Sequence, residues 1–251
     1  MLKQESCLSY HSRHDVTRVY SNIGGEALAV RGLPGLLLKS RGSGVLVVGD
    51  LHIGFERELA MQGIHPTSQW RRLFRKIVKA SIRLKADTLV ILGDLKHDVL
   101  GGGRRELAEA GRLLRELGEA FKEVVVVRGN HDGLIGETIK SLGMSNIRLE
   151  EAKGFLMDRV YLMHGHAAPD DKLMESKLVI LAHAHPVSPG KRGKVLVKGR
   201  IQLMDEKSLP FLIIPAMSYL VPGLDYSKAI EFLPLLRRSK ASVTEVYTME
   251  G

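Results

Sequence analysis

The chain has 251 residues, of which 44% are hydrophobic and 26% are charged, and this balance is ordinary for a soluble protein with a sizeable core. Its single cysteine, Cys7, excludes an internal disulfide and a cysteine-built zinc site, so a reducing interior is the expected compartment. The formal charge of +9 and the isoelectric point of about 9.6 favour anionic partners such as nucleic acid or phosphoesters. A solvated, lysine-rich surface would explain the same charge equally well.

The N-terminal 22 residues are polar and lack the apolar core of a signal peptide. We expect residues 1–22 to form a disordered extension. The most apolar tract, residues 209–224, contains Pro210, Pro215 and Pro222, which disfavour a membrane helix and favour a strand followed by a turn-rich loop. Residues 23–251 are therefore expected to form a single cytoplasmic domain with no membrane segment.

Short apolar runs separated by turn residues predict most of the strands. Ala27–Arg31 and Leu36–Lys39 flank a Gly-Leu-Pro-Gly sequence, which is typical of a hairpin. The β-branched run that starts at Val124 predicts a strand buried on both faces. Further strands are predicted at Val45–Val48, Thr88–Leu92, Ile147–Leu149, Phe155–Met157, Val160–Met163, Leu178–Leu181, Lys194–Lys198 and Phe211–Ile214.

Two segments show helical periodicity. Thr67–Leu84 has apolar residues at helical spacing, and so has the segment from Leu107 to Leu117. Together with the strands, they predict an α/β (α+β) fold in which a two-sheet β-sandwich is flanked by helices. The polar face of the first helix is basic, and we interpret it as a solvated face in preference to a nucleic-acid contact. This stripe consists of Arg72, Arg75, Lys76, Lys79 and Arg83.

Polar residues with metal-ligand chemistry cluster at the ends of five predicted strands. Seven of the ten histidines fall in these short segments, a clustering that favours a metal site over core packing. Imidazole and carboxylate ligands without thiolate suit manganese, iron or zinc. Seven of the strand-end residues are candidate ligands, which is more than the four ligands of one tetrahedral site. Two metals that share a carboxylate are therefore expected. The strand-end residues are Asp50, His52, Asp94, His97, Asn130, His131, His164, His166, His183 and His185.

These segments resemble the motifs of the calcineurin-like metallophosphoesterases. The matches are Asp-x-His, Gly-Asp-x-x-His, Gly-Asn-His-Asp, His-Gly-His and a near match to Gly-His-x-His, between Val45 and Pro186. The chain looks most like the small archaeal SbcD-related enzymes and the bacterial ligase-associated (PdeM-like) phosphoesterases, on its Gly-Phe-Glu at residues 54–56 and its Pro-Ala at residues 215–216. One departure is Ala182, where the family usually has glycine. The resemblance implies the four-layer αββα fold of that family.

The resemblance also implies a role for each matching residue. Asp50, His52 and His185 would hold one divalent metal ion. The second ion would be bound by Asn130, His164 and His183, with Asp94 bridging the two ions. Manganese is the expected metal, with iron, zinc, nickel or cobalt as alternatives. The catalytic residues implied are His131 as proton donor, Asp132 as its orienting partner, and His97.

The roles of two histidines, His97 and His166, each have two possible interpretations. Two interpretations of His97 are equally supported: it contacts the substrate phosphate, or it forms a hydrogen bond to a metal ligand. His166 is interpreted as a structural loop residue in preference to a functional one.

The expected function is metal-dependent hydrolysis of phosphodiester bonds by a hydroxide that bridges the two ions. Nucleic acid, DNA or RNA, is the favoured substrate, in a role related to DNA repair, because basic residues follow the last motif. A phosphodiesterase or phosphomonoesterase for small nucleotides is the alternative, and a non-catalytic scaffold of the same fold is disfavoured by the complete ligand set. A repair-protein partner and a homodimer are left open. The basic residues in question are Lys191, Arg192, Lys194, Lys198 and Arg200.

Overall fold

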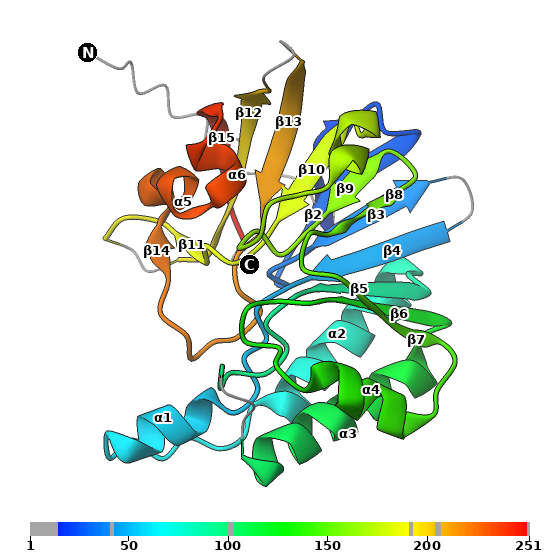
Figure 1. The fold of residues 1–251 in the computed structure, drawn as a ribbon, viewed down its shortest axis with the longest axis vertical. Coiled ribbons are helices and arrows are strands. Elements are labelled where there is room, and N and C mark those ends of the chain that lie inside the picture. The colour runs from blue at the N-terminus through cyan, green and yellow to red at the C-terminus, as the bar shows by residue number, and fades with distance from the viewer. Residues whose placement is uncertain (1–14, 41–42, 100–102, 191–192, 204–206, 250–251) are drawn as a thin grey trace.

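A computed structural model describes residues 15–40, 43–99, 103–190, 193–203 and 207–249. Its elements form four layers, with two sheets in the middle and helices on both outer faces (Figure 1). This arrangement confirms the predicted sandwich of two sheets flanked by helices. No helix in the described ranges is both long enough and apolar enough to cross a membrane.

The first sheet has seven strands, in the order β1 to β7. The first four strands pair antiparallel, and β4 to β7 pair in parallel. Helices α2, α3 and α4 cover its outer face, and α1 projects at one side (Figure 1). The elements are β1 (Val16–Ser21), β2 (Gly25–Val30), β3 (Leu36–Ser40), β4 (Ser43–Val48), α1 (Phe55–Met61), α2 (Trp70–Leu84), β5 (Thr88–Leu92), α3 (Arg104–Ala120), β6 (Glu123–Val127), α4 (Ile135–Leu142) and β7 (Ile147–Glu150).

The second sheet has six strands, in the order β15-β12-β13-β10-β9-β8. Its strands β9, β10 and β13 run parallel. A two-stranded sheet pairs β11 with β14, and helices α5 and α6 pack beside the larger sheet (Figure 1). The elements are β8 (Phe155–Met157), β9 (Val160–Leu162), the 3-10 helix η1 (Asp171–Glu175), β10 (Leu178–Leu181), β11 (Pro186–Val187), β12 (Val195–Gln202), β13 (Ser208–Ile213), β14 (Leu224–Asp225), α5 (Tyr226–Phe232), α6 (Pro234–Arg237) and β15 (Lys240–Thr248).

Three apolar cores separate the four layers, because successive side chains of a strand point to opposite faces. In β4, Leu46 and Val48 pack against the helices, whereas Val47 packs between the two sheets. In β10, Ile180 faces the core between the sheets, and Leu181 faces the core beneath α5 and α6. Strands buried on both faces explain the continuous apolar runs of the sequence.

The predicted hairpin and the predicted strands are confirmed within one or two residues at most of their ends. The expected extension needs a correction, because Val16–Ser21 form β1 and pair with β2 through a register shift between Arg18 and Tyr20. Val19 is 3% exposed in the core between the sheets, so the segment is anchored by burial as well as by its pairing with β2. Residues 1–14 of the expected extension lie outside the described residues.

Parallel pairing brings the ends of several strands to one edge of the molecule. The loops after β4, β5 and β6 begin beside one another in the first sheet. The loops after β9 and β10 do the same in the second sheet. Hydrogen bonds join the two sets of loops, for example from the amide of His183 to Oδ2 of Asp50 at 3.1 Å. Ligands of open α/β sheets bind at such carboxyl ends.

Candidate metal centre

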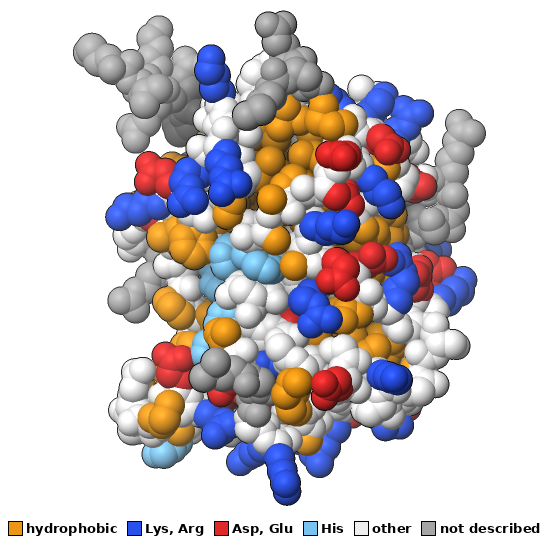
Figure 2. Space-filling model, viewed as in Figure 1, with side chains coloured by type: hydrophobic (Ala, Val, Ile, Leu, Met, Phe, Trp, Pro, Cys, Tyr) orange, Lys and Arg blue, Asp and Glu red, His pale blue; other side chains and the backbone are white. Residues whose placement is uncertain are grey.

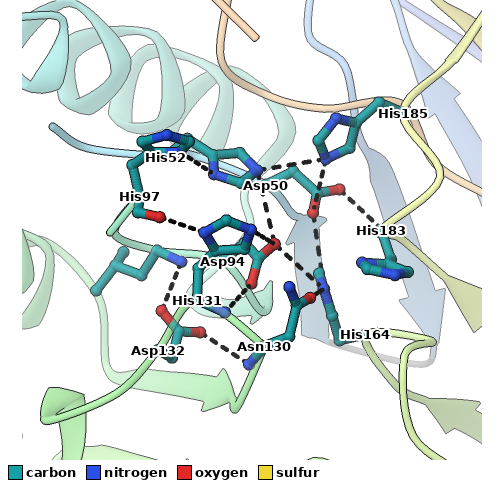
Figure 3. A network of polar contacts seen from close by, with 12 residues as sticks. Asp50, His52, Asp94, His97, Asn130, His131, Asp132, His164, His183 and His185 are labelled. Atoms are coloured by element: carbon teal, nitrogen blue, oxygen red, sulfur yellow. Dashed lines mark hydrogen bonds and ion pairs between the residues drawn. The ribbon is translucent and has the colours of Figure 1, made fainter. Parts of the chain in front are cut away.

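The strand-end residues labelled in Figure 3 converge on one cluster. The cluster is built on an unusual backbone. Of the nine non-glycine residues with positive φ in the described chain, five are candidate ligands. Such conformations cost about 1–3 kcal/mol each and concentrate at functional sites. The five are Asp50, His52, Asp94, His183 and His185, with φ between 44° and 68°.

Two glycines leave room for the cluster. A Cβ on Gly93, whose φ is +75°, would lie 2.5 Å from Nδ1 of His164. A Cβ on Gly129 would lie 2.2 Å from Oδ1 of Asp94. Gly129 is therefore required by the close approach of Asp94, since its own φ is not positive. Any side chain at either position would displace a candidate ligand.

Among the described residues, three groups have one donor atom of each residue within 4.8 Å of the others. One of them joins His52 to His97 and His131, and the other two consist of candidate ligands alone. Asp50, His52 and His185 make the first group. Asp94, His164 and His183 make the second, and Oδ1 of Asn130 lies 3.1 Å from Nε2 of His164. These groups match the two sets of ligands that the sequence resemblance implies.

Asp94 lies between the two groups. Its Oδ2 is 3.6 Å from Nε2 of His52 in the first group and 3.4 Å from Nε2 of His164 in the second. Its Oδ1 accepts a hydrogen bond of 2.9 Å from the amide of His131. The carboxylate is 2% exposed, so it faces both groups inside the protein.

Backbone carbonyls preset the tautomers of three histidines. Nδ1 of His164 donates to the carbonyl of Leu92 at 2.8 Å, and Nδ1 of His185 donates to Pro222 at 3.3 Å. Nδ1 of His131 similarly donates to the carbonyl of His97. Each ring therefore turns Nε2 toward the cluster. Such hydrogen bonds fix which nitrogen is available to a metal or a substrate.

Burial and neighbouring charges shift the pKa values of the cluster residues in opposite directions. Burial opposes ionisation of Asp94, but the neighbouring His164 outweighs it and holds the pKa of Asp94 below its ordinary value. Burial likewise lowers the pKa of His164, but Asp94 and Asp50 outweigh burial and raise it to about 9. Burial lowers the pKa of His52 to about 3 and that of His183 to about 4. These two rings are neutral, which is the form that binds metals.

His131 lies at the mouth of the cluster with its side chain 21% exposed. Its Nε2 is 4.0 Å from Oδ2 of Asp94. Asp132, fully buried, accepts hydrogen bonds from the amides of Gly129 at 2.8 Å and Leu95 at 2.9 Å. Burial and the charge of Asp94 raise the pKa of Asp132 to about 6. Asp132 thus ties together the loops after β5 and β6, while the ring of His131 is held by the carbonyl of His97.

The loop that carries His131 is also held by a buried lysine. Lys96 is 0% exposed, and its ammonium donates to the carbonyl oxygens of His131 and Asp98. A buried lysine is costly unless its hydrogen bonds are satisfied. Lys96 therefore fixes the backbone on both sides of the cluster mouth.

The ring of His97 contacts the candidate ligand His52. Its Nε2 lies 2.7 Å from Oε2 of Glu58, and its Nδ1 lies 3.2 Å from Nδ1 of His52. The buried carboxylate of Glu106 accepts the amides of His97 and Asp98 at 2.9 and 2.8 Å. A chain from Glu58 through His97 to His52 leaves Nε2 of His52 facing the cluster. Of the two interpretations of His97, this geometry favours the hydrogen bond to a ligand.

Two further side chains border the second group. The ring of His166 lies 5.1 Å from the ring of His164, and its Nδ1 is buried without a hydrogen bond to the described residues. The ring of Phe232 stacks on His183 at 4.8 Å and is 50% exposed. Phe232 comes from α5, so it carries no motif, and an aromatic residue near a helix end gives no sequence signal of its own.

The basic segment after the last motif does not form one surface. The ammonium of Lys194 binds the carbonyls of Ala216 and Ser218. Lys198 pairs with Glu245 at 2.5 Å, and Arg200 donates to Ser208 at 3.0 Å. Lys191 and Arg192 lie outside the described residues. The three described residues therefore have structural contacts within the second sheet and the segment that follows it.

Histidine side chains reach the surface in a strip on one face of the molecule (Figure 2). The donors behind this strip suit a divalent transition metal, because they are imidazole nitrogens and carboxylate or amide oxygens without thiolate. Oδ1 of Asp50 is buried without a hydrogen bond to the described residues, and it lies 3.3 Å from Nε2 of His185. A buried carboxylate oxygen that lacks a donor fits a metal ligand. Together, the residues present are consistent with a dinuclear metal site.

Comparisons with known proteins identify a similar fold and a family. Among solved structures, the chain is similar to Pseudomonas putida nuclease MPE, at 21% identity over 84% of this chain and 90% of that chain, with a TM-score of 0.59. It is also similar to YfcE, a phosphoesterase from E. coli, at 17% identity over 71% and 81% of the two chains, with a TM-score of 0.37. The first likeness shows a shared fold. Curated protein sequences give no match.

Residues 44–217 match the family model described as calcineurin-like phosphoesterase. The matched segment contains every candidate ligand and ends at Met217. It leaves out α5 and α6, which border the site. The match covers more than half of the chain, and the chain therefore belongs to the calcineurin-like phosphoesterase family of hydrolases.

Proposed function

We propose that this protein is a dinuclear-metal-dependent phosphodiesterase that acts on nucleic acid. The observation that supports this most strongly is the position of Asp94 between two groups of nitrogen and oxygen donors. In the proposal, one ion is bound by Asp50, His52 and His185, and Asp94 is shared with a second ion. The second ion is bound by Asn130, His164 and His183.

Bound divalent ions would lower the pKa of a coordinated water toward neutrality and neutralise charge on the reacting phosphate. Two divalent ions would carry four positive charges, and the two ligand carboxylates, Asp50 and Asp94, would neutralise only two of them. The loaded site would therefore keep a net positive charge and attract a phosphate. Manganese is the proposed metal because the donor set is rich in imidazole and carboxylate, and iron, zinc, nickel and cobalt suit it as well.

His131 would act on the leaving group. Its Nδ1 is committed to the carbonyl of His97, so only Nε2 can exchange a proton with a substrate. Its backbone amide binds Asp94, which places the ring next to the shared carboxylate. A protonated Nε2 in this position could protonate the departing oxygen. Asp132 and Lys96 would hold the loop in place, and His97 would orient His52.

The choice of nucleic acid as substrate rests on two supports. The formal charge of the chain is +9, which favours a polyanion. The structural likeness to a protein described as a nuclease points the same way. A small-nucleotide phosphodiesterase remains the alternative, because the exposed ring of Phe232 beside His183 could contact one base as well as a strand.

Activity assays separate these possibilities. We expect the manganese-loaded protein to hydrolyse bis(4-nitrophenyl) phosphate and single-stranded DNA, and to hydrolyse 4-nitrophenyl phosphate more slowly. Release of nitrophenolate and cleavage of a labelled oligonucleotide measure the rates, and the chelator-treated protein is the control. Preference for the monoester, or cleavage of cyclic nucleotides with intact DNA, would refute the nuclease assignment.

A further inference from the structure

The basic stripe of α2 is not a uniform solvated face. Arg83 pairs with Asp15 at 3.3 Å and donates to the carbonyl of Arg31. Arg72 and Lys76 instead turn toward one aromatic ring, that of Tyr219. The exposed residues Arg75 and Lys79 lie on the same helix outside these contacts.

Three cations gather around Tyr219. The guanidinium of Arg72 lies 4.4 Å from the ring centroid, and the ammonium of Lys76 lies 4.6 Å from it. The ammonium of Lys194 approaches from the second sheet at 4.7 Å. The ring is 37% exposed, so the group opens to solvent. Cation–π contacts within about 6 Å are attractive, and they hold the cations in place.

Hydrogen bonds attach this group to the metal centre. Tyr219 follows Ser218, whose amide donates to the carbonyl of Asp50 at 3.0 Å. The hydroxyl of Ser218 lies 3.0 Å from Oε1 of Gln69, whose amide nitrogen donates to the carbonyl of His52 at 3.2 Å. Two residues of the proposed first metal site are thus tied to the segment that presents Tyr219.

The charge of the group is not compensated by nearby carboxylates. Among the described residues, neither Arg72 nor Lys76 forms an ion pair with a carboxylate. Burial and the charge of Arg72 lower the pKa of Lys76, which shows that the two cations disfavour each other. Like charges held together beside a catalytic site attract an anion. Positive charges combined with an aromatic ring are typical of grooves that track a nucleic-acid strand.

We propose that Arg72, Lys76 and Tyr219 bind a phosphate of a polynucleotide strand whose scissile phosphate lies at the metal centre. This inference rests on the proposed function. It adds to phosphodiester hydrolysis a second site that binds the polynucleotide strand. The two cations contact the phosphate, and the ring positions them. The proposed contact is to a phosphate other than the scissile one, so a diester with a single phosphate cannot occupy both places.

The test compares two double variants of the same helix. The manganese-loaded R72A/K76A and R75A/K79A proteins lose equal charge, but only the first removes the proposed contact. Binding of a fluorescent phosphorothioate 12-mer is followed by anisotropy at increasing salt. Each phosphate of a single strand that is no longer neutralised lowers the salt slope by about 0.7. Because both cations contact the same phosphate, we expect a decrease of roughly 0.7 for R72A/K76A, and the wild-type slope for R75A/K79A.

A third variant, Tyr219→Leu, keeps the charges but removes the ring that holds them. We expect it to weaken binding of the 12-mer about fivefold, the equivalent of one cation–π contact. Equal slopes for the two double variants would show that α2 acts only through its overall charge and would overturn the proposal. Hydrolysis of bis(4-nitrophenyl) phosphate by the wild type reports separately on the proposed function, since the binding result does not depend on turnover.

Discussion

Replacing Asp94 by alanine is expected to abolish binding of both metal ions, and hydrolysis with it. The carboxylate of Asp94 faces both ligand groups, 3.6 Å from Nε2 of His52 and 3.4 Å from Nε2 of His164. Without it, two divalent ions would face Asp50 as the remaining carboxylate, and their mutual repulsion would be poorly compensated. We expect metal content, measured by inductively coupled plasma mass spectrometry, to fall below one ion per chain. Turnover should fall by more than ~10³-fold, the upper end of the loss from a single oxyanion-stabilising donor.

Two controls separate metal loss from misfolding. Asp94→Asn keeps an oxygen that can accept the amide of His131, so it preserves the loop while removing the charge. Asp87→Asn removes a carboxylate that pairs with Lys122 outside the candidate site, and should retain both ions. If Asp94→Ala still binds two ions per chain, Asp94 does not bridge them.

Replacing His131 by alanine should lower turnover without lowering the metal content. The ring lies outside both proposed ligand sets, with Nε2 4.0 Å from Asp94, so both ions and the fold should be retained. Loss of a general acid lowers turnover by ~10²–10⁴-fold. Metal content and kcat on a dinucleotide measure the two effects. The exposed His65 offers a matched control, since His65→Ala removes an imidazole outside the candidate site.

The leaving group sharpens this prediction. Nitrophenolate leaves without protonation, whereas the alkoxide of a nucleotide needs a proton. His131→Ala should therefore impair hydrolysis of bis(4-nitrophenyl) phosphate less than that of a dinucleotide. Equal losses on the two substrates, or loss of metal, would contradict the role of proton donor.

The sequence predicted most of the strands, and the strand ends at which the polar residues gather, because both are local features. A β-branched run such as the one in β6 signals burial by itself, and a polar residue directly after it must lie at the strand end. Asp50, Asp94 and Asn130 follow such runs. Parallel pairing then brings them together without further information.

The remaining features depend on contacts between distant segments. Glu58 meets His97, and Tyr219 meets Arg72, only after the chain has folded. Neither pair has a periodicity or spacing that could reveal it. The same limit explains Lys194, which looked like part of a nucleic-acid surface but binds the carbonyls of Ala216 and Ser218. A charge pattern does not show which cations are already engaged.

The most direct test of the dinuclear site is anomalous scattering from crystals soaked in manganese. We predict two peaks roughly 3.5–4 Å apart. One should contact Asp50, His52 and His185, the other Asn130, His164 and His183, and both should contact Asp94. A single peak, or two peaks that do not share Asp94, would contradict the dinuclear assignment.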